Sequence, residues 1–120
     1  MTIRPLNRYL AIRALHKDMA IEMLNGDRAV KIRKHIVFYG WVQGVGFRWR
    51  ASRAAALYGA TGWVRNDWNG PVSMEIQGTE EQIDGVIEAI GRGRYVKIEN
   101  MDVRTIPVID HEQGFWTKWN

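Results

Sequence analysis

A glycine-rich turn followed by an arginine is the segment of this sequence best suited to hold an anion. It consists of Gln43, Gly44, Val45, Gly46, Phe47 and Arg48. Glycines allow positive φ angles, so consecutive backbone amides can point into one concavity. A helix behind such a turn adds free amides and a partial positive charge, and a guanidinium can hold two phosphate oxygens. The residues alone fit both a phosphate site and an ordinary tight turn with a surface arginine.

Asn66 is a second polar residue that could take part in such chemistry. It ends a strand predicted from Thr61, and its side chain can reach the mouth of the turn if that strand lies beside the strand before the turn. A neutral amide can accept a proton of a water molecule and orient it, although it is a poor base. An asparagine at a strand end also commonly hydrogen-bonds its own turn. The residues therefore leave both roles open.

Two segments resemble the signatures of the acylphosphatase family. The run from Gly40 to Arg48, Gly-Trp-Val-Gln-Gly-Val-Gly-Phe-Arg, is similar to that family's phosphate loop. The run from Gly62 to Asn66, Gly-Trp-Val-Arg-Asn, is similar to the second signature, which ends in the family's catalytic asparagine. The separation of 18 residues between Arg48 and Asn66 also suits the family. The resemblance covers roughly residues 35–119.

The resemblance implies an enzyme that hydrolyses the carboxyl-phosphate bond of small acyl phosphates to carboxylate and phosphate, without a metal or other cofactor. It assigns phosphate binding to Arg48 and the loop amides, and the orientation of water to Asn66. Acyl phosphates have a good leaving group, so positioning and charge stabilisation can supply most of the rate. Where the family ends in Phe-x-Ile-Arg, this chain has Thr117 and Lys118. We expect these departures to affect an edge strand more than the site.

The elements that must position these residues follow a ferredoxin-like α+β plan. Strands are predicted at His35–Val42, Thr61–Arg65, Val72–Gln77, Val96–Ile106 and Phe115–Trp119. One helix is predicted at Phe47–Tyr58, and a second follows the capping box of Thr79 and Gln82 and closes at Gly91 or Gly93. Asn69-Gly70 is a strong hairpin signal between the second and third strands. The order β-α-β-β-α-β predicts an antiparallel sheet with two helices on one face.

The basic character of the chain is concentrated at its N-terminus. The net charge is +4 over 120 residues, yet residues 1–34 hold eight lysines and arginines against three acids, and residues 35–120 hold nine against ten. We therefore predict a basic extension over 1–34, helical or disordered, and an acylphosphatase-like domain over 35–120. Apolar residues at helical spacing favour an amphipathic helix in the extension. These are Tyr9, Ile12, Leu15, Met19 and Met23. Translation beginning at Met19 or Met23 is an open alternative, and we expect removal of residues 1–30 to leave folding and activity nearly intact.

The composition predicts a cytoplasmic protein without a membrane span or a metal site, and we expect it to be a monomer. The sequence has no cysteine, which suits a reducing compartment. No apolar run approaches the roughly 20 residues that span a bilayer. The three histidines, His16, His35 and His111, lack ligand spacing. Of the six tryptophans, we expect Trp49, Trp116 and Trp119 to pack in or near the core, whereas Trp68 is poorly placed for burial.

Binding modules on the same fold are the alternative to an enzyme. An RNA-binding domain would carry an RNP-type pattern of glycine and aromatic residues, which is missing here, and the predicted domain is close to neutral. A nucleic-acid partner is therefore not expected, and a non-catalytic anion sensor remains possible on these residues. A carbamoyl-phosphate-handling domain, as at the front of hydrogenase-maturation carbamoyltransferases, is similar in both motifs. That reading would require the rest of a large enzyme.

Overall fold

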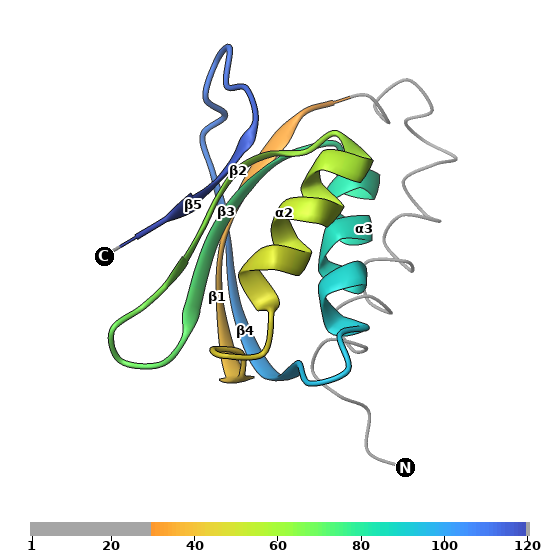
Figure 1. Ribbon diagram of the computed structural model, residues 1–120. Coiled ribbons are helices and arrows are strands. Elements are labelled where there is room, and N and C mark those ends of the chain that lie inside the picture. The colour runs from red at the N-terminus through yellow and green to blue at the C-terminus, as the bar shows by residue number, and fades with distance from the viewer. Residues whose placement is uncertain (1–29, 120) are drawn as a thin grey trace, which may run out of the picture.

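The computed structural model describes residues 30–119, in which two helices cover one face of a five-stranded sheet (Figure 1). The strands are β1 (Ile32–Trp41), β2 (Thr61–Asn66), β3 (Val72–Gly78), β4 (Lys97–Ile106) and β5 (Phe115–Lys118). The helices are α2 (Phe47–Tyr58) and α3 (Glu80–Gly91). The predicted ferredoxin-like α+β plan is confirmed, and the bounds of α2 are those expected from the sequence.

The sheet has the strand order β4-β1-β3-β2-β5 and is mixed rather than wholly antiparallel. The first four strands pair antiparallel, as predicted. β5 instead runs parallel to β2, with Gly62 opposite Phe115 and Val64 opposite Thr117. This pairing brings the C-terminal strand alongside the strand that ends in Asn66. No local sequence pattern could indicate this pairing, because β3, α3 and β4 separate β2 from β5 along the chain.

β1 begins at Ile32, three residues before the predicted start. The prediction excluded Arg33 because the preceding segment is basic, yet its side chain is only 1% exposed. Its guanidinium donates to Glu112 Oε1 at 2.7 Å, to Glu75 Oε1 at 3.1 Å and to the Gln77 amide oxygen at 3.2 Å. Buried charge is tolerated when it is paired in this way. A truncation at residue 30 leaves this strand whole, whereas the predicted amphipathic helix lies outside the described residues.

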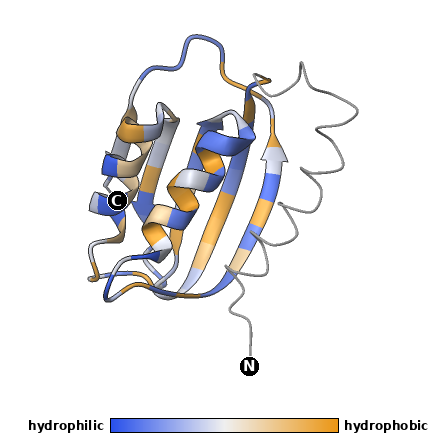
Figure 2. Cartoon of the chain, turned by 90° about the vertical axis from the view of Figure 1, so that its right-hand side faces the viewer, coloured by the Kyte–Doolittle hydropathy of each residue, from blue (hydrophilic) through white to orange (hydrophobic). Residues whose placement is uncertain are grey.

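The core lies between the helices and the sheet face that they cover. In Figure 2, orange apolar positions alternate with blue polar positions along the strands, as expected for a sheet with one buried face. The strands contribute Ile36, Phe38, Val64, Met74 and Ile76, and the helices contribute Phe47, Ala51, Ala55, Ile83, Val86, Ile87 and Ile90. The predicted capping box starts α3. The backbone N–H of Gln82 donates to Thr79 Oγ1 at 3.2 Å, and the backbone N–H of Thr79 donates to Gln82 Oε1 at 2.8 Å.

Three tryptophans that we expected in or near the core lie at the surface. Trp49, Trp116 and Trp119 are 60%, 66% and 76% exposed, so that expectation is wrong. α2 buries Phe47 and its small alanines, and Trp49 falls off that stripe. β5 is an edge strand, so Trp116 has a neighbouring strand on one side only. Trp68 is 93% exposed, as its position beside the hairpin turn suggested.

Candidate functional site

The loop between β1 and α2 has the backbone geometry of an anion site. Gly44 and Gly46 have φ angles of 74° and 81°, in the left-handed region that favours glycine. Gly46 is the N-cap of α2, where no side chain caps the helix and no acid occupies its first turn. The first amides of the helix therefore keep their hydrogens available, and the helix dipole adds positive potential there.

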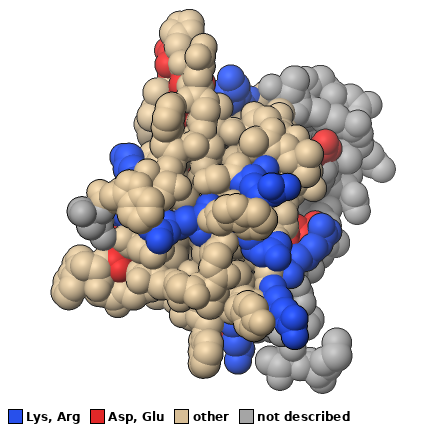
Figure 3. Space-filling view, in the orientation of Figure 1, with Lys and Arg blue, Asp and Glu red and all other residues tan. Residues whose placement is uncertain are grey.

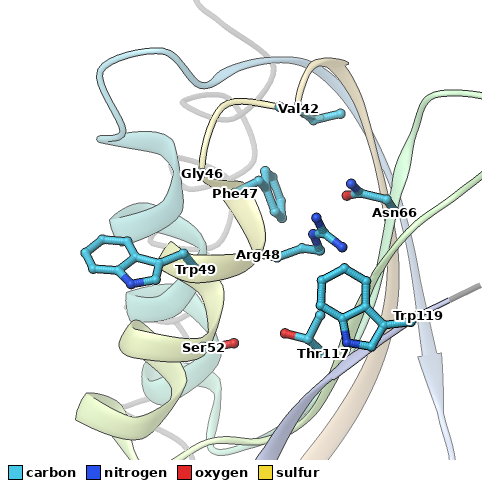
Figure 4. A pocket seen from close by; sticks show the side chains of 10 residues that line it. Val42, Gly46, Phe47, Arg48, Trp49, Ser52, Asn66, Thr117 and Trp119 are labelled. Atoms are coloured by element: carbon cyan, nitrogen blue, oxygen red, sulfur yellow. The ribbon is translucent and has the colours of Figure 1, made fainter.

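A cavity of about 360 Å³ opens beside this loop, between α2 and the ends of β2 and β5 (Figure 4). It is lined by Val42, Gly44, Gly46, Phe47, Arg48, Trp49, Ser52, Asn66, Thr117 and Trp119. Five of the predicted site residues therefore meet around one space. The volume lies in the range of small-molecule sites.

Arg48 supplies the positive charge of this cavity. Its guanidinium lies between Asn66 and Trp119 in Figure 4, with its carbon 4.5 Å from the centre of the Trp119 ring. An aromatic face attracts a cation without neutralising it. Among residues 30–119, no carboxylate forms an ion pair with Arg48. Within the described residues, its charge is not neutralised by a carboxylate.

Asn66 reaches the cavity from the opposite wall. It is the last residue of β2 and lies opposite Val72 on β3, where the hairpin begins. Figure 4 shows its side-chain amide directed toward the space in front of Arg48. The condition stated for Asn66, that its strand lies beside β1, is not met, because β3 lies between β1 and β2. Asn66 nevertheless reaches the cavity from the end of β2. The assigned role in orienting water stays a prediction.

Gln43 and Val45 do not line the cavity, although both belong to the predicted loop. The Gln43 side chain turns to the hairpin instead, where its Nε2 donates to the carbonyl oxygens of Asp67 at 2.6 Å and Pro71 at 2.9 Å. Gln43 thus braces the anion loop against the hairpin that carries Asn66. Sequence reasoning missed this contact because its partners are 24 and 28 residues away along the chain.

The side chain of Asp67 stiffens the same hairpin. Its Oδ1 accepts from Arg65 Nε at 3.1 Å, and its Oδ2 accepts from Ser73 Oγ at 2.5 Å. The Asp67 amide also donates to the Pro71 carbonyl at 2.9 Å. The turn that follows Asn66 is therefore held by side-chain and backbone bonds together. This fixes the end of β2 relative to the loop.

Three residues at the end of the cavity away from the glycine loop were not among the predicted site residues. Ser52 comes from α2, and Thr117 and Trp119 come from β5 and the residue after it. We expected the departure at Thr117 to affect the edge strand more than the site, yet Thr117 also lines the cavity. Thr117 lies opposite Val64, which belongs to the core, so its side chain faces the helices and the cavity. Alternation along the last strand was the available signal, but its pairing with β2 had to be known.

The wider surroundings of the cavity are basic. α2 carries three arginines, Arg48, Arg50 and Arg53, and no acid. Figure 3 shows lysine and arginine side chains gathered across the face that α2 occupies in Figure 1. Within residues 30–119 no group of three histidine, aspartate or glutamate side chains is arranged to hold a metal ion, and neither α2 nor α3 is long and apolar enough to span a membrane.

Comparison with known proteins gives a consistent result. Residues 34–117 match the model of the acylphosphatase family. The acylphosphatase of Bifidobacterium longum is 40% identical over 80 residues, which are 66% of this chain and 82% of that protein. The acylphosphatase of Clostridium beijerinckii is 36% identical over 89 residues, which are 73% of this chain and 99% of that protein.

Solved structures agree with the sequence relatives. The crystal structure of acylphosphatase from Bacillus subtilis has a TM-score of 0.67 and 27% identity, covering 72% of this chain and 98% of that one. Full-length HypF, in a phosphate- and nucleotide-bound form, also gives a TM-score of 0.67 at 27% identity. That match covers 78% of this chain but 12% of HypF.

Proposed function

The chain belongs to the acylphosphatase family and is an enzyme, and on this premise we propose that it hydrolyses the carboxyl-phosphate bond of small acyl phosphates without a metal. The products are a carboxylate and inorganic phosphate. The observation that carries the proposal is the convergence of the glycine loop, Arg48 and Asn66 on one cavity.

In this proposal the phosphate group lies in the loop between β1 and α2. The first amides of α2 donate to its oxygens, and Arg48 binds two of them at once. Charge that develops on these oxygens in the transition state then meets donors already in place, which is the main source of rate. The ring of Trp119 restricts where the guanidinium can point.

Asn66 orients the attacking water from the opposite wall. The water oxygen forms a bond to phosphorus, the bond from phosphorus to the carboxyl oxygen breaks, and the carboxylate leaves with the electron pair. The ten residues that line the cavity include no carboxylate and no imidazole. The proton of the water therefore passes to an oxygen of the substrate's own phosphate. Holding water and phosphate in line supplies what a strong base would otherwise contribute.

Phosphate release from benzoyl phosphate and acetyl phosphate, assayed with EDTA present, tests the proposal. We expect the native chain to be active, Arg48→Ala to lose about 10²–10³-fold in kcat/KM, and Asn66→Ala to lose a similar factor mainly in kcat. Arg104→Ala and Asn69→Ala are matched controls, because both residues are exposed and lie outside the cavity. Native rates in Asn66→Ala would refute its role, and an inactive native chain would favour a binding module.

A further inference from the structure

The cavity continues beyond the part that a phosphate group would fill. Gly44, Gly46, Arg48 and Asn66 surround its loop end, whereas Ser52, Thr117 and Trp119 form a second end between α2 and β5 (Figure 4). A volume of about 360 Å³ accommodates a small organic molecule rather than a single phosphate group. If the phosphate occupies the loop, the rest of the substrate extends toward this second end.

Trp119 is the largest apolar surface at the second end. Thr117 on β5 and Trp119, the residue after the end of β5, both line the cavity. Lys118 faces the other side, with its Nζ 4.3 Å from the Trp63 ring. The Trp119 ring contacts the Arg48 guanidinium, and yet the residue as a whole remains 76% exposed. An indole fixed beside the charged group of a site, with most of its surface accessible, offers a stacking surface to whatever the charged group holds.

The chemistry of this end favours a flat apolar group. Arg48 is the one charged residue among the ten that line the cavity, and its guanidinium would be bound to the phosphate group. The wall of this end consists of the indole of Trp119 and the side chains of Ser52 and Thr117, whose hydroxyl groups face each other in Figure 4. Aromatic groups prefer to stack on such a ring with an offset.

We propose that Trp119 seats the acyl substituent and makes the site selective for acyl phosphates with planar, aromatic acyl groups over small aliphatic ones. The inference rests on the proposed function, because it takes the phosphate to lie in the loop. Trp119 is then a specificity-determining residue in addition to its contact with Arg48. A role confined to positioning Arg48 would affect all substrates alike, and a seat for the acyl group would not.

Ratios of kcat/KM for benzoyl phosphate and acetyl phosphate in the full-length chain test this. We expect Trp119→Ala to lower the benzoyl-to-acetyl ratio about tenfold and Trp119→Phe to retain most of it. Trp116→Ala is the matched control, since Trp116 is 66% exposed and lies three residues before Trp119 but does not line the cavity. Its ratio should stay native. An equal loss for both substrates in Trp119→Ala overturns the proposal.

Calorimetric binding of benzylphosphonate and methylphosphonate, which are not hydrolysed, separates this inference from the proposed function. The native chain should bind benzylphosphonate about tenfold more tightly, and Trp119→Ala should lose that preference. This result supports binding of the acyl substituent by Trp119 even if neither acyl phosphate is hydrolysed, in which case the proposed function alone fails. Equal affinities of the native chain for the two phosphonates overturn the proposed role of Trp119 even if hydrolysis is observed.

Discussion

Arg33 and Arg48 belong to the same domain and have opposite surroundings. Arg33 lies in β1, is 1% exposed, and donates to two glutamates and a glutamine. Arg48 lies beside an open cavity with its guanidinium against an aromatic ring. A guanidinium saturated by acids fixes strands and loops together, whereas one that faces a ring and a cavity keeps its charge for a ligand. The surroundings decide between a structural and a functional arginine, and the residue type does not.

Exchanging each arginine for methionine gives the sharpest test of this contrast. Arg33→Met leaves Glu75 and Glu112, which are 21% and 15% exposed, without their main partner, and should cost about 3–5 kcal/mol of unfolding free energy. Arg48→Met should change that free energy by no more than about 0.5 kcal/mol, yet lower kcat/KM by about 10²–10³-fold. Urea denaturation and phosphate release measure the two effects. A folded Arg33→Met variant without activity would break the contrast.

Gln43 combines a structural role with a functional one. Its hydrogen bonds to the hairpin are structural, but they hold the glycine loop that forms the cavity. Gln43→Leu removes the donor to the Asp67 and Pro71 carbonyls while keeping most of the side-chain volume. We expect a loss of about 1–2 kcal/mol in stability and about tenfold in kcat, since Asn66 loses its fixed position relative to the loop.

Ser73→Ala is the control for Gln43. It removes the bond to Asp67 within the hairpin but leaves the connection to the loop intact. Its stability should fall while kcat stays within about twofold of native. If Gln43→Leu also keeps its kcat, the brace serves stability alone.

The smallest expected effect concerns the stability of the fold at low pH, through Glu75, a partner of Arg33. Burial alone would raise the pKa of Glu75, but hydrogen bonds from His35 and Arg33 and the charges of both outweigh it and hold the pKa below its ordinary value. A depressed pKa in the folded state gives stability that is present above about pH 4.3 and is lost as the pH falls through the folded-state value. Urea midpoints between pH 7 and pH 3 should therefore fall less steeply in Glu75→Gln than in the native chain. A parallel decline would contradict this.

Local sequence patterns predicted most of the scaffold. The helix after the glycine loop has the predicted bounds, and the Thr79 capping box forms. β2 extends one residue further than predicted, to Asn66, and β4 begins at Lys97. These features depend on backbone preferences and periodicity among neighbouring residues, so they can be read without a partner segment. Gly44 and Gly46 were identified for the same reason.

The sequence by itself determined the order of the elements, the glycine loop, and the presence of Arg48 and Asn66 at either side of it. Only the tertiary structure decided that Arg33 is buried, that Gln43 binds the hairpin, and that Thr117 and Trp119 complete the cavity. Each of these depends on a contact between segments far apart in the chain, and the parallel pairing of β5 with β2 creates the last of them. The local pattern of either segment cannot specify such a contact, because the burial or direction of one residue is set by a partner that the pattern does not contain.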